Sequence, residues 1–439
     1  MQRLVTIEEF EDRSAAIGVV GLGYVGVSLL VALARHFRVC GFDRDPRRIR
    51  ELKKGFDRTR SVTAAEIGAI DRTLTIDESV LEQCKLIIIS VPTPITPSLY
   101  PNLEPLKDAA RAVARRVSGG SVIVIESTVY PGVTEGIVRP IITNESKLEP
   151  GDRLHFGYSP ERINPGDGQH SLGRIPKVVA GDSDAVTDLL AKVYGAIANG
   201  VHQATSIKVA EAAKVLENTQ RDVNIALMNE AATIFRRIGV DTRDVIRTAS
   251  TKWNFAPFEP GLVGGDCIAT DPYYLLHIAR KTGTDAAVIS ASRDVNDGMG
   301  RYVAEHTGAL IRSRSNARSE ARVLILGISF KENVPRVQNT RVVDIVDALV
   351  LQRVSCSVFD PIADADEVRA LGYDPLTSVD RDAPYDAVVV AVKHRLFITT
   401  LPITRLLKLM VPGKGVLVDV KSMYDRREVE KSGMIYWSL

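Results

Sequence analysis

A single cysteine stands inside the glycine-rich stretch GLVGGDCIATDPYY, which runs from Gly261 to Tyr274. A cysteine with a structural role usually packs as a small hydrophobe in an apolar strand or helix. Glycines instead let the backbone approach another group closely, so the thiol of Cys267 is placed to contact a ligand. Its position leaves two interpretations open, a nucleophile and a structural thiol. Cys40, Cys84 and Cys356 lie in or beside apolar runs and are predicted to be core residues.

Two more groups of polar side chains could assist a reaction. Lys214 and Asn218 are four residues apart in a helical pattern, so they share a helix face. Together they could donate to a developing oxyanion, although this spacing alone favours a solvated polar stripe. Glu161 and Arg162 follow the strand-like segment LHFGY. Glu161 could act as a general base or could simply be a carboxylate that starts a helix.

The sequence GLGYVG, from Gly21 to Gly26, follows an apolar run and precedes a helical pattern. Such glycines allow a tight turn, the approach of a pyrophosphate and close packing of helix on strand. Asp43 ends the next apolar run, 17 residues after Gly26, where a carboxylate would accept the ribose hydroxyls and repel a 2′-phosphate. An arginine could instead hold that phosphate, and three follow at once, namely Arg44, Arg47 and Arg48. The pattern predicts a dinucleotide site and favours NAD over NADP.

The elements around these residues indicate the fold. Apolar runs rich in Ile and Val alternate with amphipathic segments over the first 200 residues, which predicts a doubly wound α/β sheet. Residues 206–238 contain no Gly or Pro and predict one long helix, either a spine between domains or a dimer interface. Further helices are expected at 241–250, 271–281 and 285–312, before a polar linker at 312–322.

A second α/β pattern follows this linker and repeats the first one. In both, the first strand ends in Gly and the second ends in Phe-Asp, at Phe42-Asp43 and Phe359-Asp360. The predicted fold is therefore two Rossmann-like doubly wound domains joined by a helical middle. The expected boundaries are 1–204 for the NAD-binding domain, 205–312 for the helical domain with the cysteine loop, and 313–439 for the second Rossmann-like domain.

The composition of the 439 residues excludes several classes of protein. With 45% hydrophobic residues, 25% charged residues and a net charge of +2, nothing suggests a nucleic-acid or membrane partner. Four irregularly spaced cysteines argue against a disulfide scaffold, and neither they nor the seven histidines show metal-ligand spacing, so no metal is expected. The N-terminus shows no signal peptide, and the apolar run 18–34 with its early glycines predicts strand, turn and helix rather than a membrane span. A reducing cytoplasm is the expected location.

Seven motifs together carry a resemblance that extends almost from end to end. They are GLGYVG, SVPTP (90–94), ESTVYPG (126–132), SPERINPGD (159–167), AAKVLENTQRDVNIALMNE, GLVGGDCIATDPYYL and GISFKENVP (327–335). In this order and spacing they resemble the UDP-glucose/GDP-mannose dehydrogenase family. The segments GFDRT (55–59) and KWNFAPFEPGLVGG (252–265) are most similar to its UDP-N-acetylhexosamine dehydrogenase branch.

The resemblance implies an NAD-dependent nucleotide-sugar 6-dehydrogenase, which oxidises the C6 hydroxyl of the sugar to a carboxylate with two NAD in succession. The first oxidation gives an aldehyde, a thiolate adds to it, and the second leaves a thioester that water cleaves. The product would be a uronic acid for glycan or natural-product assembly. The resemblance also implies a homodimer formed through the long helix.

The resemblance also assigns roles to particular residues. Cys267 would be the nucleophile, Lys214 and Asn218 would stabilise oxyanions, and Glu161 would be the base for the hydrolytic water, which Thr128 and Asp271 would position. The cofactor would be held by Gly21, Gly23, Tyr24, Val25, Gly26, Asp43, Arg48, Thr93, Ser127 and Thr128. The sugar nucleotide would be bound by Glu161, Arg162, Lys214, Asn218, Phe258, Pro260, Gly261, Gly264 and Lys331.

Ala269-Thr270 replaces the pair that usually precedes the aspartate of this motif, and three further positions depart from the family pattern. The residue before Cys267 is Asp266, where this branch usually has His and other branches have Ser. Arg336 stands at the usual aspartate, and Gln338 at the usual arginine that would meet the cofactor pyrophosphate. A carboxylate next to a thiol disfavours the thiolate.

Three alternatives remain open, the first two because of these departures and the third because it shares the N-terminal fold and the long helix. The first is a UDP-glucose or dTDP-glucose 6-dehydrogenase, and the second is an impaired paralogue that binds sugar nucleotides without oxidising them. The third is a one-step β-hydroxyacid dehydrogenase, which needs no cysteine. Because every group that acts in the family's chemistry is present, an active enzyme with a UDP-N-acetylhexosamine substrate is expected.

Overall fold

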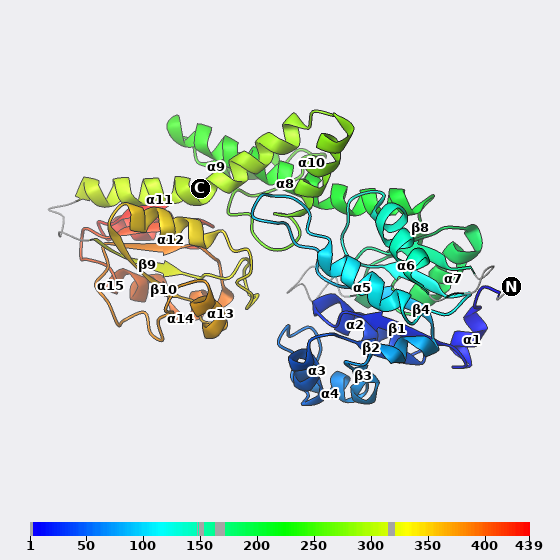
Figure 1. The fold of residues 1–439 in the computed structure, drawn as a ribbon. Coiled ribbons are helices and arrows are strands. Elements are labelled where there is room, and N and C mark those ends of the chain that lie inside the picture. The colour runs from blue at the N-terminus through cyan, green and yellow to red at the C-terminus, as the bar shows by residue number, and fades with distance from the viewer. Residues whose placement is uncertain (1–2, 147, 149–152, 163–171, 315–320) are drawn as a thin grey trace. The chain divides into compact units, whose positions relative to one another are not determined.

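The computed structural model describes residues 3–146, 148, 153–162, 172–314 and 321–439. The chain divides into two compact units (Figure 1). The first comprises residues 1–217 and 273–284, and the second comprises residues 218–272 and 285–439. The long helix α8 (Ile207–Arg237) and the helix α10 (Asp271–Thr282) each contribute residues to both units.

The first unit is built on an eight-stranded sheet with the order β3-β2-β1-β4-β5-β6-β7-β8. All neighbouring strands are parallel except β6 and β7, which are antiparallel. The strands are β1 (Ala16–Val20), β2 (Val39–Phe42), β3 (Leu74–Thr75), β4 (Cys84–Ile89), β5 (Val122–Ile125), β6 (His155–Tyr158), β7 (Lys177–Gly181) and β8 (Val201–Gln203). The chain reverses direction across the sheet between β1 and β4, which is where doubly wound folds bind dinucleotides.

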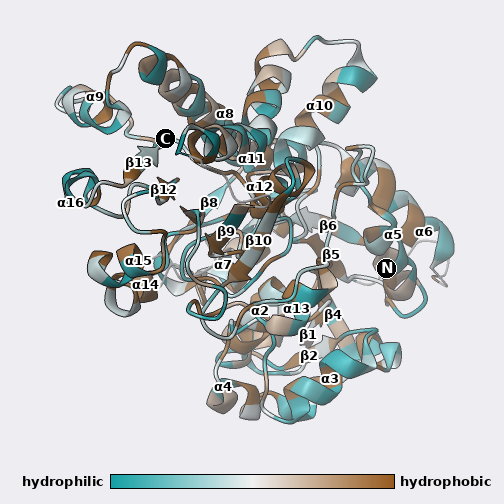
Figure 2. Ribbon diagram, turned by 90° about the vertical axis from the view of Figure 1, so that its left-hand side faces the viewer, coloured by the Kyte–Doolittle hydropathy of each residue, from teal (hydrophilic) through white to brown (hydrophobic). Residues whose placement is uncertain are grey.

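Helices cover both faces of this sheet because its strands are apolar on both sides. One core joins the sheet to α2 and α7, and the other joins it to α5, α6 and the first turns of α8. The α-helices before α8 are α1 (Ile7–Glu11), α2 (Tyr24–Ala34), α3 (Pro46–Lys53), α4 (Ala64–Gly68), α5 (Glu104–Ala114), α6 (Arg139–Glu145) and α7 (Asp184–Gly195). Shorter turns are η1 (Asp71–Thr73), η2 (Glu78–Gln83), η3 (Thr134–Val138) and η4 (Leu172–Arg174). Figure 2 shows α3 as a largely hydrophilic helix, and its buried side chains are only Arg48, Ile49 and Leu52.

The second unit contains a parallel five-stranded sheet with the order β10-β9-β11-β12-β13. Its strands are β9 (Ala321–Leu326), β10 (Val354–Phe359), β11 (Ala387–Val390), β12 (Val416–Asp419) and β13 (Ile435–Ser438). Its helices are α9 (Thr242–Ala249), α11 (Ala287–Arg314), α12 (Val342–Leu351), α13 (Ala365–Ala370), α14 (Arg395–Thr400), α15 (Ile403–Lys408) and α16 (Arg426–Lys431). Helices α11 and α12 pack on one face, and α14, α15 and α16 pack on the other (Figure 1).

The structure confirms the predicted α/β class with two doubly covered sheets, of which the first is mostly parallel and the second is parallel throughout. The apolar run 18–34 is divided between β1, a turn and α2, and the predicted long helix is observed as α8. Within the described ranges, no helix is both long and apolar enough to cross a membrane. The middle of the predicted linker, 315–320, lies outside the described residues, as does the whole INPGD segment (163–167) that follows Arg162.

Candidate active site

The glycine turn after β1 has the shape that a dinucleotide requires. Gly21 has a φ of +88°, and a Cβ added there would lie 2.8 Å from the carbonyl oxygen of Ser90. A Cβ on Gly26 would lie 1.9 Å from the carbonyl oxygen of Gly21, so helix and turn can only pack this closely with glycine. Gly23 is exposed and borders open space instead. No side chain caps the start of α2 at Tyr24, and the N-terminus of a helix in this position is where a phosphate binds in dinucleotide sites.

Asp43 lies next to this turn, at the end of β2. Its Oδ2 accepts a hydrogen bond from the backbone N–H of Leu22 at 2.7 Å, and its Oδ1 accepts one from Asp45 at 2.9 Å. These two donors fix the carboxylate beside the pyrophosphate position, where a ribose follows in a bound dinucleotide. Tyr24 and Val25 occupy the first turn of α2 on the other side of the turn, and both are half-buried.

The three arginines near Asp43 are all engaged by carboxylates. Arg44 pairs with Asp108 at 3.1 Å and Arg47 pairs with Glu51 at 3.0 Å. Arg48 is buried, pairs with Asp57 at 2.8 Å, and donates from Nε to the carbonyl oxygen of Leu22 at 2.7 Å. Arg48 therefore stabilises the backbone of the glycine turn through its hydrogen bond to Leu22. This arrangement fits NAD better than NADP, because each guanidinium already neutralises a carboxylate.

The loops after β4 and β5 are joined at the carboxyl edge of the sheet. Thr93 donates from Oγ1 to the carbonyl oxygen of Thr128 at 2.6 Å, and Ser127 donates from Oγ to that of Val91 at 2.7 Å. The hydroxyl of Tyr274 donates to the carbonyl oxygen of Thr93. Thr93, Ser127 and Thr128, which the family resemblance assigns to the cofactor, are thus brought together at the carboxyl ends of β4 and β5.

Glu161 follows β6 and is buried together with a lysine that the sequence analysis missed. Its Oε1 accepts the backbone N–H of Arg162 at 2.6 Å, and its Oε2 lies 3.8 Å from Nζ of Lys177. Lys177 is fully buried and donates to the carbonyl oxygen of Pro160 at 2.9 Å. Lys177 therefore holds both the residue before Glu161 and the Glu161 carboxylate.

Lys177 also forms an ion pair with the fully buried Glu126. The hydroxyl of Tyr194 donates to Oε2 of Glu126 at 2.6 Å. Burial raises the pKa of Glu126, and the positive charge of Lys177 opposes that rise. Arg162 points elsewhere, because it pairs with Glu217 at 2.8 Å and donates to the carbonyl oxygen of Pro176 at 3.2 Å.

The cysteine loop belongs to the second unit, and there Cys267 is exposed, whereas Cys40 and Cys84 are buried. The N–H of Asp271, at the start of α10, donates to the carbonyl oxygen of Cys267 at 2.8 Å. Asn218 of α8 donates from Nδ2 to Oδ2 of Asp271 at 2.5 Å. The predicted residues Asn218, Asp271 and Cys267 are therefore brought together. Lys214 is buried and lies on the part of α8 that belongs to the first unit. The buried Glu161 and the half-buried Thr128 belong to the first unit as well.

The segment before the cysteine is held by a buried asparagine. Both atoms of the Asn229 amide bond the backbone of Gly261, because Nδ2 donates to its oxygen at 3.1 Å and Oδ1 accepts its N–H at 2.7 Å. Pro260 accepts a hydrogen bond from Nζ of Lys421 at 3.2 Å. Gly264 approaches the second sheet's loop so closely that a Cβ would lie 2.7 Å from the carbonyl oxygen of Asn339. Phe258, before this segment, and Lys331, after β9, are both half-buried.

Sequence reasoning missed Lys177 and Asn229, although both left a signal. Lys177 opens the strand KVVAG, where a charged residue beside four apolar or small ones needs a buried partner. Asn229 follows Asn218 by 11 residues, close to three helical turns, so it lies on the same face of α8. A further buried network joins Asn229 to Asn296 at 2.8 Å and Asn296 to Asp222 at 2.7 Å.

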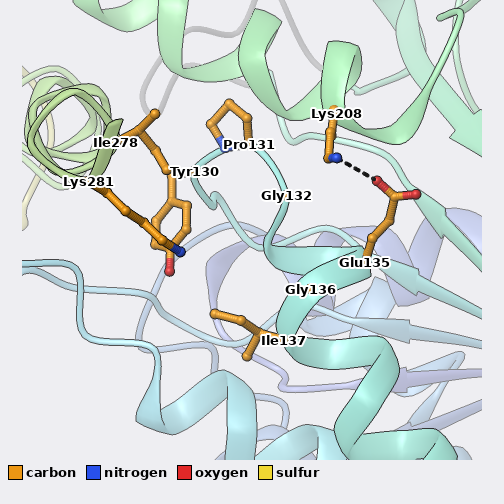
Figure 3. A pocket seen from close by; sticks show the side chains of 9 residues that line it. All are labelled: Tyr130, Pro131, Gly132, Glu135, Gly136, Ile137, Lys208, Ile278 and Lys281. Atoms are coloured by element: carbon orange, nitrogen blue, oxygen red, sulfur yellow. Dashed lines mark ion pairs between the residues drawn. The ribbon is translucent and has the colours of Figure 1, made fainter. Parts of the chain in front are cut away.

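A separate cavity of about 420 Å³ lies in the first unit, beside the segment Tyr130–Gly132 (Figure 3). Its lining residues are Tyr130, Pro131, Gly132, Glu135, Gly136, Ile137, Lys208, Ile278 and Lys281. The ion pair between Lys208 and Glu135, at 4.0 Å, spans part of it. None of these residues is among the predicted site residues. Within the described ranges, no group of His, Cys, Asp and Glu side chains could hold a metal ion.

The first unit therefore has the doubly wound fold and the glycine turn that are typical of a dinucleotide-binding domain. Comparison with known proteins identifies the group to which it belongs. Residues 15–198 match the NAD binding domain of the UDP-glucose/GDP-mannose dehydrogenase family, residues 208–298 its central domain, and residues 324–426 its UDP binding domain. The chain belongs to this family, which confirms the resemblance seen in the sequence.

Several relatives are similar over nearly the whole chain. A UDP-N-acetyl-D-glucosamine 6-dehydrogenase of Pseudomonas aeruginosa is 44% identical over 93% of this chain and 97% of its own length. An enzyme of the same name from Salmonella typhi is 45% identical over 87% and 90%. Among solved structures, a UDP-D-ManNAc dehydrogenase from Pyrococcus horikoshii has a TM-score of 0.86 at 27% identity, covering 96% of this chain and 98% of that one.

Proposed function

We propose that this dehydrogenase oxidises C6 of UDP-N-acetylglucosamine to the uronic acid, with Cys267 as the nucleophile. The observation that carries the proposal is the exposed Cys267, whose backbone is tied to Asp271 and, through it, to Asn218. The substrate is suggested by the two relatives at 44% and 45% identity, both of which are UDP-N-acetyl-D-glucosamine 6-dehydrogenases. The C-terminal match to a UDP binding domain supports a UDP-sugar over a dTDP-sugar.

The proposed reaction balances as two oxidations and one hydrolysis. NAD, when bound, accepts one hydride from C6 in each oxidation. After the first, the Cys267 sulfur bonds to the aldehyde carbon; after the second, that carbon is a thioester. Water then breaks the C–S bond and returns the thiol. Overall, one alcohol, one water and two NAD⁺ give one carboxylate, two NADH and three protons.

The other predicted residues have proposed roles that suit their places. Lys214 and Asn218 would donate to the oxyanions, and Glu161 would take a proton from the hydrolytic water, helped by Thr128 and Asp271. The glycine turn, Tyr24, Val25, Asp43, Thr93 and Ser127 would hold NAD, with Arg48 acting through the carbonyl of Leu22. The remaining substrate-binding assignments, among them Arg162 and Lys331, stay predictions, as does the division at 204 and 312. We propose the cytoplasm as the location, because NAD and sugar nucleotides are available there.

The experiment that tests this function counts NADH against sugar consumed at saturation, with a panel of UDP- and dTDP-sugars. We expect two NADH per UDP-N-acetylglucosamine, with a higher kcat/KM for it than for any other donor. One NADH per sugar would support the one-step alternative instead. A preference for UDP-glucose or dTDP-glucose would keep the chemistry and change the substrate. Binding without NADH formation would identify a paralogue that has lost catalysis.

We also propose that the protein is a homodimer that pairs through α8. Four apolar side chains of this helix are between 48% and 60% exposed: Val209, Leu216, Leu227 and Ile234. Their spacings of 7, 11 and 7 residues place them on one face of the helix. A row of exposed apolar side chains along a 31-residue helix is typical of a surface that another chain covers.

Replacing Leu227 by glutamate should convert the dimer to monomers, because burying a carboxylate in an apolar interface is unfavourable. The molar mass is measured by light scattering coupled to size-exclusion chromatography, at several protein concentrations. Leu351→Glu is the matched control, since Leu351 is 86% exposed at the end of α12 and lies off this face. A wild-type protein that elutes as a monomer at all concentrations would rule out the α8 dimer.

A further inference from the structure

The residue before Cys267 is bound by an arginine from a distant part of the sequence. Nη2 of Arg336 lies 2.7 Å from Oδ2 of Asp266, and both residues belong to the second unit. Arg336 is further held by Gln338, whose Oε1 accepts from Nε at 3.1 Å and also from Nη2. Asp266 and Arg336 both depart from the family pattern, and Gln338, which departs from it too, holds the arginine.

Two hydrogen bonds of the Gly265 backbone join the same two loops next to Asp266. The N–H of Gly265 donates to the carbonyl oxygen of Asn339 at 3.0 Å, and Asn339 donates from Nδ2 to the oxygen of Gly265 at 2.7 Å. Gly265 has a φ of +85°, and a Cβ there would lie 2.7 Å from the ring of Phe330. The cysteine loop is therefore docked on the loop after β9 by main-chain bonds at residue 265 and by an ion pair at residue 266.

The ion pair adds little to the stability of the fold. The side chain of Asp266 is 54% exposed and that of Arg336 is 23% exposed, and pairs as exposed as this have small net effects on unfolding. Its consequence is local, because Asp266 is directly bonded to the residue that carries the thiol. An unpaired carboxylate there would disfavour the thiolate, which is the reactive form. A guanidinium on that carboxylate cancels most of this effect.

We propose that Arg336 is a positioning residue for Cys267, which neutralises Asp266 and fixes the cysteine loop against the loop after β9. The proposal rests on the proposed function, in which Cys267 is the nucleophile. It accounts for two unusual charges at once, because each compensates the other across 70 residues of sequence. It also predicts that neither can be replaced alone without a change at the thiol.

The test is the pH dependence of thiol alkylation in the full-length protein. Iodoacetamide labelling of Cys267 is followed by peptide mass spectrometry between pH 6 and 10, with Cys267→Ser as the blank. In Arg336→Gln we expect the midpoint of labelling to move up by about one pH unit, within the usual range of protein-induced pKa shifts. In Asp266→Asn/Arg336→Gln the midpoint should return to the wild-type value, because the uncompensated carboxylate is gone.

The rate of uronate formation should follow the ionisation of the Cys267 thiol. Uronate formation by Arg336→Gln should fall several-fold at pH 7 and recover towards pH 9, whereas the double variant should show no such pH-dependent recovery. Arg405→Gln is the matched control, since it removes another exposed pair of this unit, with Asp380 at 2.9 Å. Its labelling midpoint should equal that of the wild type, and the melting temperatures of all variants should agree within about 2 °C, as expected for exposed pairs.

Two results would overturn the proposal. One is an unchanged labelling midpoint in Arg336→Gln. The other is an equal shift in the single and the double variant, because Arg336 would then act through a group other than Asp266. A different result would show that the proposed function itself is wrong. In that case Cys267→Ser would still form two NADH per sugar, whatever the labelling of the other variants shows.

Discussion

Replacing Cys267 by serine should lower the release of uronate at least about a thousandfold, as removal of a covalent nucleophile generally does. Without the thiol, the aldehyde of the first oxidation has no covalent route to the second. The loop should keep its backbone, because its contacts at Gly261 and Gly265 are made by main-chain atoms with Asn229 and Asn339. The measurement is uronate by chromatography, together with NAD affinity by calorimetry, which we expect to be unchanged.

Cys356→Ala supplies the control for the loss of a thiol as such. Cys356 lies in β10, where burial raises the pKa of its thiol to about 12, so it is not reactive at neutral pH. This variant should keep the wild-type rate of uronate release. If Cys267→Ser keeps that rate too, the thioester route is wrong and the second oxidation must proceed without a covalent intermediate.

Most of the fold could be predicted from the sequence, because its signals are local. Each strand of the first sheet that faces two helix layers is a short run of apolar residues, and α8 is a long stretch without Gly or Pro. The places of the glycine turn and of Asp43 in the fold could be predicted for the same reason. The spacing from Gly26 to Asp43 is set by one strand–helix–strand unit. The predicted repeat is also observed, since Asp360 accepts the N–H of Ile328 at 2.8 Å just as Asp43 accepts that of Leu22.

The partners of charged residues could not be predicted, because they come from distant segments. Arg336 and Asp266 are 70 residues apart in the sequence, and each residue considered alone suggests an impaired active site. Arg48 could have met a phosphate, but in the structure it holds Asp57 and the carbonyl oxygen of Leu22. Asp360 is the residue of the second Rossmann-like fold that is equivalent to Asp43. Its Oδ2 lies 3.1 Å from Nε2 of His394, so this carboxylate already has a side-chain partner. Burial alone would raise the pKa of Asp360, but His394 and backbone donors hold it well below its usual range.

Lys177 is the missed residue with the largest expected effect on stability. Its ammonium is fully buried between the carboxylates of Glu126 and Glu161 and is 5.3 Å from the centre of the Tyr194 ring. A buried ion pair need not stabilise a protein relative to an apolar core, but removal of one partner leaves a buried charge uncompensated. Such a loss usually costs about 3–5 kcal/mol.

Lys177→Met should therefore lower the melting temperature of the protein by roughly 10 °C, given about 2–4 °C per kcal/mol for a domain of this size. Lys85→Met is the matched control. Lys85 is half-buried in the same sheet, and its ammonium bonds only neutral atoms, the Ser118 hydroxyl and the Gly119 carbonyl oxygen, both at 2.9 Å. The control should lose clearly less stability. Equal losses would mean that the methylene packing of Lys177 matters and its charge does not.

The loss of thermal stability in Lys177→Met should also depend on pH, and it should grow as the pH rises. Burial already raises the pKa of Glu126, and Lys177 is the charge that opposes this rise, so without it the folded state binds the proton of Glu126 more tightly. A group whose pKa is raised on folding stabilises the fold when protonated, and this contribution is lost as the pH rises through the folded pKa. The difference in melting temperature between variant and wild type should hence be larger at pH 8 than at pH 5.5.

Adding Glu126→Gln to Lys177→Met separates the two functions of this lysine. The double variant has no uncompensated charge at position 126, so it should regain much of the lost stability and most of the pH dependence should vanish. It still lacks the ammonium that holds the carbonyl oxygen of Pro160 at 2.9 Å and faces Glu161 at 3.8 Å. Uronate release should therefore stay impaired although the fold has recovered, because Glu161 is no longer fixed. Full recovery of both would show that Lys177 serves the core alone and that Glu161 is positioned by other contacts.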